Sequence, residues 1–73
     1  MTKLPVLSGQ ECVKALEKAG FRIDRQKGSH IMMYRNDPIT LVVVPNHREI
    51  DRGTLRSIIR QSGLSVEEFI ELL

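Results

Sequence analysis

Three short apolar runs, separated by two turns, occupy the middle of the chain and constrain its fold more than any other feature. The runs are Phe21–Arg25, His30–Arg35 and Ile39–Val44. Turn-forming segments, Gln26-Lys27-Gly28 and Asn36-Asp37-Pro38, lie between them, and short runs bounded in this way are typical of β-strands. The spacing therefore predicts a three-stranded antiparallel sheet.

Helix-start and helix-stop residues lie on both sides of these runs. In a capping box, a serine caps the helix and a glutamate three residues later reaches back to it, while a glycine often ends a helix. The first helix is expected to begin at the box Ser8–Glu11 and to end at Gly20, and the second to begin at Asp51 and to end at Gly63. The box Ser65–Glu68 is expected to begin a third, short helix. These signals predict one small α+β domain over residues 1–73, with the order α-β-β-β-α and a short C-terminal helix.

The composition indicates a small domain of the reducing cytoplasm. Cys12 is the one cysteine among 73 residues, so a disulfide within the chain is excluded, and its place on an apolar helix stripe predicts burial. A lone cysteine without a recognisable secretory segment is typical of cytoplasmic proteins. No apolar run approaches the roughly 18 residues of a membrane span, so no membrane partner is expected.

Nearly every position of the second and third runs is apolar, so both faces of the sheet need cover. Two short helices can cover one face, and we expect another protein chain to bury the other. The two sets assigned to opposite faces are Met32, Tyr34, Val42 and Val44, and Ile31, Met33, Leu41 and Val43.

The segment Gly28-Ser29-His30 places a titratable side chain at the start of the second run, beside cations. Histidine exchanges a proton near neutral pH, and the neighbouring Lys27 and Arg25 can attract and stabilise a phosphate. His47, in the loop after the third run, is a candidate second proton carrier or a loop residue bonded to backbone. Tyr34 and Lys27 are further candidates for the second proton carrier.

Arg52, Arg56 and Arg60 recur at every fourth position of the second long helix and form a ridge beside its apolar face. Such a ridge can contact RNA phosphates, pair with acidic groups of a protein partner, or face solvent. The segment His47–Asp51 alternates three metal-ligand types, but its last residue is better explained as a helix cap. No metal site is predicted.

These motifs occur in the order and spacing of a known family. They are found in Leu16–Phe21, Gln26–His30, Val44–His47, Gly53–Gln61 and Leu64–Phe69. The chain thereby resembles the HicA-type toxins, small mRNA interferases of bacterial and archaeal toxin–antitoxin systems.

The resemblance implies a fold like the double-stranded-RNA-binding domain, a catalytic histidine at His30 and inhibition by a HicB-type antitoxin. We therefore expect a type II toxin that cleaves mRNA without a metal ion or other cofactor. His30 would be the general base, with Lys27 beside it, and Arg25, Ser29 and the arginine ridge would bind RNA. Homo-oligomers would form through the toxin–antitoxin complex. The alternative is a non-catalytic RNA-binding module of the same fold.

Overall fold

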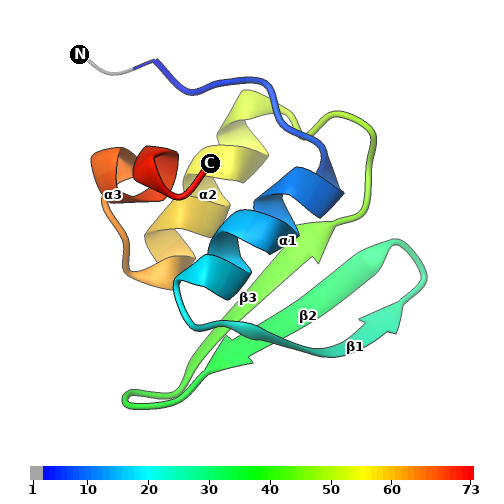
Figure 1. Ribbon diagram of the computed structural model, residues 1–73. Helices are drawn as coiled ribbons and strands as arrows, with labels where there is room; N and C mark the ends of the chain where they lie inside the picture. The colour runs from blue at the N-terminus through cyan, green and yellow to red at the C-terminus, as the bar shows by residue number, and fades with distance from the viewer. Residues whose placement is uncertain (1–2) are drawn as a thin grey trace.

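A computed structural model describes residues 3–73 and shows helices covering one face of a three-stranded antiparallel sheet (Figure 1). The elements are α1 (Gly9–Lys18), β1 (Arg22–Lys27), β2 (His30–Arg35), β3 (Thr40–Pro45), α2 (Arg52–Ser62) and α3 (Val66–Glu71). The strand order is β1-β2-β3. The predicted α+β class and element order are confirmed. Within the described residues, no helix has the length and apolarity needed to cross a membrane.

The β1–β2 hairpin is tighter than predicted. The sequence indicated a turn from Gln26, but β1 continues to Lys27, and only Gly28 and Ser29 connect the strands. Gly28 has a φ of 59°, a conformation that glycine adopts at little cost and that two-residue hairpin turns require. As a consequence, Lys27 pairs directly with His30.

Both predicted capping boxes are present. The Ser8 hydroxyl accepts a hydrogen bond from the Glu11 amide at 3.1 Å, and the Ser8 amide donates to the Glu11 carboxylate at 2.9 Å. Ser65 and Glu68 repeat the arrangement at the start of α3. Asp51 occupies the predicted N-cap position of α2, but its carboxylate is hydrogen-bonded by the Thr54 hydroxyl and does not form the usual cap hydrogen bond to the helix backbone.

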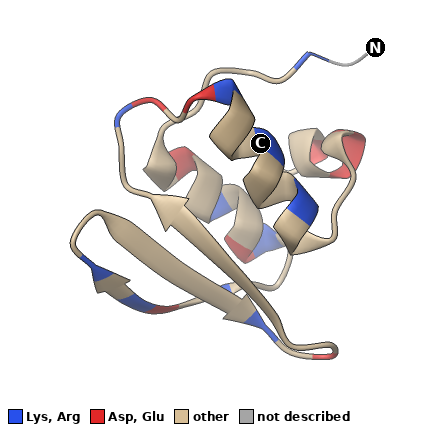
Figure 2. Ribbon diagram, turned by 180° about the vertical axis from the view of Figure 1, so that it is seen from behind, with Lys and Arg blue, Asp and Glu red and all other residues tan. Residues whose placement is uncertain are grey.

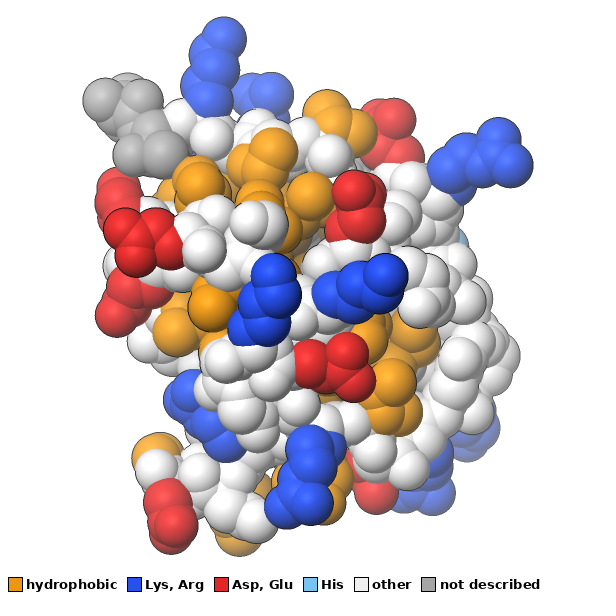
Figure 3. Space-filling model, in the orientation of Figure 1, with side chains coloured by type: hydrophobic (Ala, Val, Ile, Leu, Met, Phe, Trp, Pro, Cys, Tyr) orange, Lys and Arg blue, Asp and Glu red, His pale blue; other side chains and the backbone are white. Residues whose placement is uncertain are grey.

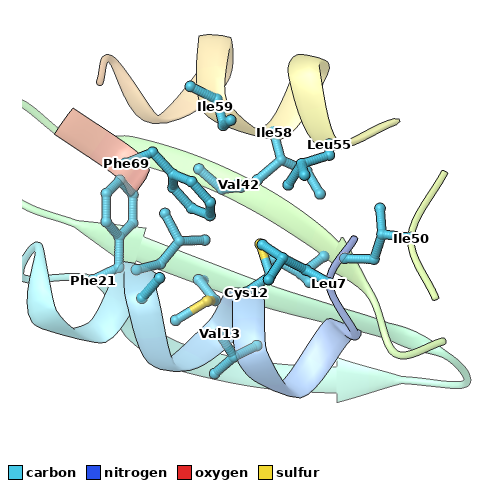
Figure 4. Packing of buried hydrophobic residues seen from close by; sticks show 14 of the residues in the cluster. Leu7, Cys12, Val13, Phe21, Val42, Ile50, Leu55, Ile58, Ile59 and Phe69 are labelled. Carbon is cyan, nitrogen blue, oxygen red and sulfur yellow. The ribbon is translucent and has the colours of Figure 1, made fainter. Parts of the chain in front are cut away.

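The hydrophobic core fills the space between the helices and the sheet (Figure 4). Phe21 and Phe69 are its largest fully buried side chains, and Leu4 and Leu7 of the N-terminal segment also belong to it. Cys12 is fully buried, and burial raises the pKa of its thiol to about 12. The prediction that Cys12 is a packing residue is confirmed, because a neutral buried thiol is a poor nucleophile.

The sheet has one covered and one uncovered face, but their composition differs from the predicted sets. The register pairs Met33 with Val42 and Met32 with Val43. Within each strand, the predicted alternation of side chains between the two faces is confirmed. The predicted match of faces between β2 and β3 is wrong, because the β2–β3 connection sets the register and neither apolar pattern does. The buried set is Ile31, Met33, Val42 and Val44, and the outward set on these strands is His30, Met32, Tyr34, Leu41, Val43 and Pro45.

Arg35, the last residue of β2, joins the C-terminal ends of α1 and α2. Its guanidinium donates hydrogen bonds to the carbonyls of Ala19 at 3.2 Å and Ser62 at 3.3 Å. It also lies 4.7 Å from the centroid of the Phe21 ring. A helix C-terminus carries partial negative charge, so the Arg35 cation is favourably placed at the C-termini of both helices. No sequence pattern had indicated this role for Arg35.

Candidate active site

His30 begins β2 and lies on the outward face of the sheet. It pairs with Lys27 on one side and with Pro45 on the other, and paired residues of an antiparallel sheet point to the same face. The structure therefore places the two predicted catalytic side chains next to each other, both exposed to solvent.

A bulge in β1 brings further cations to the same face. Ile23 pairs with Met33 and Arg25 with Met32, so Asp24 is an extra residue, and the alternation of β1 changes phase there. Arg22, which lies 5.8 Å above the Tyr34 ring, therefore shares the outward face with Arg25 and Lys27. We call Arg22, Arg25 and Lys27 the β1 cation row; it is seen as blue segments along this strand in Figure 2.

A hollow of about 330 Å³ opens beside His30, at the end of the sheet. One wall comes from β2 and β3, and the other comes from the loop after β3 and the first turn of α2. The lining residues are His30, Val43, Pro45, His47, Ile50, Asp51 and Thr54. Both histidines of the chain thus face one space, which we call the histidine hollow.

Backbone hydrogen bonds hold the loop that carries His47. The Asn46 amide donates to the Ser29 carbonyl at 2.6 Å, and the Gly9 amide donates to the His47 carbonyl at 2.8 Å. A β-carbon at position 9 would collide with the Pro45 carbonyl oxygen, so glycine is needed for the close approach of α1. The position of the His47 backbone is therefore fixed relative to the turn that precedes His30.

The two imidazoles of the histidine hollow are free to meet a ligand. Within residues 3–73, neither imidazole makes a hydrogen bond or an ion pair with another part of the chain. The Thr54 hydroxyl, by hydrogen bonding, lowers the pKa of the Asp51 carboxyl below its ordinary value. Asp51 is consequently an ionised carboxylate near neutral pH, beside two uncommitted imidazoles.

The arginine ridge lies away from the histidine hollow. Successive residues of a helix are separated by about 100° around its axis, so Arg56 lies about 200° from Thr54. Arg56 and Arg60 line a different hollow, of about 300 Å³, between α2 and α3, and Figure 2 shows the ridge as blue bands along α2. The structure brings Lys27, Arg25 and Ser29 to His30, but leaves the ridge apart.

Charges of both signs are mixed on the face that carries the helices. Acidic and basic side chains alternate across the view in Figure 3, with apolar groups in small areas between them. In residues 3–73, no group of three histidine, cysteine, aspartate or glutamate side chains is arranged to hold a metal ion. This includes the alternating ligand types of the segment His47–Asp51.

Three contributors to the site were missed by sequence reasoning. Arg22 joins the cation row only through the bulge, for which the sequence carries no signal. Thr54 lines the hollow because it is one helical turn after Asp51, a spacing that was available in the sequence. The role of Gly9 depends on a contact between distant segments.

Comparison with known protein families identifies most of the chain. A family model described as "HicA toxin of bacterial toxin-antitoxin" matches residues 9–64. The matched range includes the β1–β2 hairpin, both histidines and α2. A search of curated proteins gives no match.

Proposed function

Because the chain belongs to the HicA toxin family of bacterial toxin–antitoxin systems, we propose that it is an endoribonuclease that cleaves mRNA with His30 as general base. The observation that supports this most directly is the position of His30. His30 is the strand partner of Lys27, its imidazole makes no hydrogen bond or ion pair within the described residues, and it faces a hollow large enough for part of a nucleotide.

The reaction needs a base at the ribose 2′-hydroxyl. A neutral imidazole takes this proton efficiently near neutral pH, and the resulting 2′-oxygen attacks the adjacent phosphorus. The products are a 2′,3′-cyclic phosphate and a 5′-hydroxyl. No step in this scheme requires a metal ion, so metal independence is part of the proposal.

Negative charge that develops on the phosphate needs stabilisation. Lys27 is directly opposite His30, and Arg25 lies two positions before Lys27 on the same face. Cations placed beside the reacting phosphate act mainly on the transition state, where the charge is largest. We assign this role to Lys27, with Arg25 and Ser29 contacting the neighbouring part of the RNA.

The β1 cation row gives the RNA backbone a path to His30, so reversing its charges is expected to reduce the salt dependence of RNA binding. The change is Arg22→Glu, Arg25→Glu and Lys27→Glu together, in a His30→Ala background that prevents cleavage. Each lost phosphate contact lowers the slope of log K against log salt by about 0.7–0.9. Binding is measured by fluorescence anisotropy across a salt series.

The arginine ridge provides a control with the same change of charge. Reversal at Arg52, Arg56 and Arg60 is expected to lower the slope less, because the ridge lies on the other side of α2 from the hollow. A larger fall in the ridge variant would instead place the RNA across α2, in line with the RNA-binding role expected for the ridge from the sequence. The ridge would otherwise be left for solvent or a protein partner.

Cleavage in the presence of EDTA distinguishes the nuclease from the alternative, a non-catalytic RNA-binding module. Purified protein is expected to cut RNA in excess EDTA and to leave 2′,3′-cyclic phosphate ends, identified by mass spectrometry. Bound but intact RNA would support the RNA-binding module. Activity that is lost in EDTA and restored by a divalent ion would contradict metal independence.

We propose a HicB-type antitoxin as the protein partner and the outward sheet face as its docking surface. Leu41 is 68% exposed and Val43 43% exposed on this face, beside the β1 cation row. Apolar groups flanked by cations suit a partner with apolar and acidic side chains. Val43 also lines the histidine hollow, so a chain that covers it would restrict access of RNA to His30.

A further inference from the structure

The histidine hollow contains a second proton carrier as well as the proposed base. Cleavage of RNA needs a base for the 2′-hydroxyl and an acid for the departing 5′-oxygen, and these atoms lie on opposite sides of the phosphorus. A site with two imidazoles facing one space can place one at each atom. His30 and His47 come from different segments and meet only in this hollow.

The loop that carries His47 is built for a fixed position. It is bonded to the turn before His30 through Asn46 and Ser29, and to the start of α1 through the Gly9 amide. These contacts use the His47 carbonyl and leave its imidazole without a partner in residues 3–73. A histidine whose only task was to bond the backbone would have its ring engaged.

The other candidates for the acid are less well placed. Tyr34 is four residues from His30 along β2, which corresponds to about 13 Å at about 3.3 Å per residue. Lys27 pairs with His30 from the opposite strand, on the side away from the hollow, where it suits the phosphate charge. Asp51 lines the hollow as a carboxylate with no proton to give, because Thr54 lowers its pKa.

We propose that His47 is the general acid that protonates the 5′-oxygen as the phosphorus–oxygen bond breaks. This assignment rests on the proposed nuclease function and adds the second half of its proton transfer. The 2′-oxygen–phosphorus bond forms while its proton passes to His30. The phosphorus–5′-oxygen bond breaks while His47 delivers a proton, and exchange with water returns both rings to their starting states.

A substrate with sulfur at the 5′-bridging position tests this role, because a thiolate leaves without being protonated. The probe is an RNA oligonucleotide with this sulfur at the bond that wild-type protein cuts, compared with the all-oxygen oligonucleotide. His47→Ala and His47→Gln are expected to slow cleavage of the oxygen substrate by about 10²–10⁴-fold. Their loss on the sulfur substrate should be less than about tenfold, whereas His30→Ala slows both.

Each other outcome overturns a defined part of the proposal. Equal loss on both substrates would give His47 a role in binding or loop structure, and wild-type rates on both would remove it from the reaction. Failure of the wild-type protein to cut either substrate would reject the nuclease function itself. Glu49→Gln, an exposed change in the same loop, is the matched control and should leave both rates unchanged.

Discussion

Replacing His30 with alanine is expected to lower RNA cleavage by about 10²–10⁴-fold, the usual contribution of a general base, and to abolish growth arrest. The side chain is exposed and makes no hydrogen bond within residues 3–73, so its removal should not disturb the core. Single-turnover cleavage rates measure the chemical step, and circular dichroism with thermal unfolding measures the fold.

RNA affinity separates a chemical role of His30 from a binding role. If His30 acts on the proton, the alanine variant should bind RNA within about tenfold of wild type while cleavage is lost, a change that affects the rate constant rather than substrate binding. Asn36→Ala, at the turn at the other end of β2, is the control for an exposed change. A His30→Ala protein that cleaves at the wild-type rate would contradict the mechanism.

The secondary structure was largely predictable because its signals are local. Each capping box lies within four consecutive residues, and both form the hydrogen bonds expected of them. The apolar runs likewise predicted three strands. The strand ends could not be predicted as closely, because the extent of β1 depends on the length of the turn that follows it. The turn consists of Gly28 and Ser29 alone, and the pairing of β1 with β2 therefore extends to Lys27.

The arrangement of side chains on the sheet was not predictable to the same degree. The outward face depends on the register between β2 and β3 and on the bulge at Asp24, and a shift of one residue reverses the face of a whole strand. The sequence therefore identified His30, Lys27 and Arg25 as neighbours along the chain. It did not show that Arg22 shares their face, or that His47 meets His30 in one hollow.

The contacts of Arg35 were also beyond sequence reasoning, since its partners belong to segments far from it in the chain. An arginine at the end of an apolar strand is usually a solvated residue. Here the strand ends directly beneath the C-termini of α1 and α2, so the guanidinium reaches carbonyls of both. Only the packing of the helices on the sheet reveals this contact.

Replacing Arg35 with alanine is expected to lower the free energy of unfolding by about 2–4 kcal/mol. A hydrogen bond from a charged donor contributes about 1.5–3 kcal/mol, and a cation above an aromatic ring about 0.5–2 kcal/mol, but the partial exposure of Arg35 to solvent reduces both. A domain of this length has a total stability of about 4–11 kcal/mol. Urea unfolding followed by circular dichroism measures the change.

Two further variants identify the cause of the expected loss. Arg48→Ala removes an exposed loop arginine and should change stability by less than about 0.5 kcal/mol. Arg35→Lys keeps the charge, but a single ammonium group cannot span the carbonyls of Ala19 and Ser62, so its stability should lie between those of wild type and Arg35→Ala. If the Arg35→Ala and Arg48→Ala proteins were equally stable, the link between the two helix ends would contribute nothing to the free energy of unfolding. A loss in Arg35→Ala that Arg35→Lys fully restores would assign the effect to charge at the helix C-termini rather than to the paired hydrogen bonds.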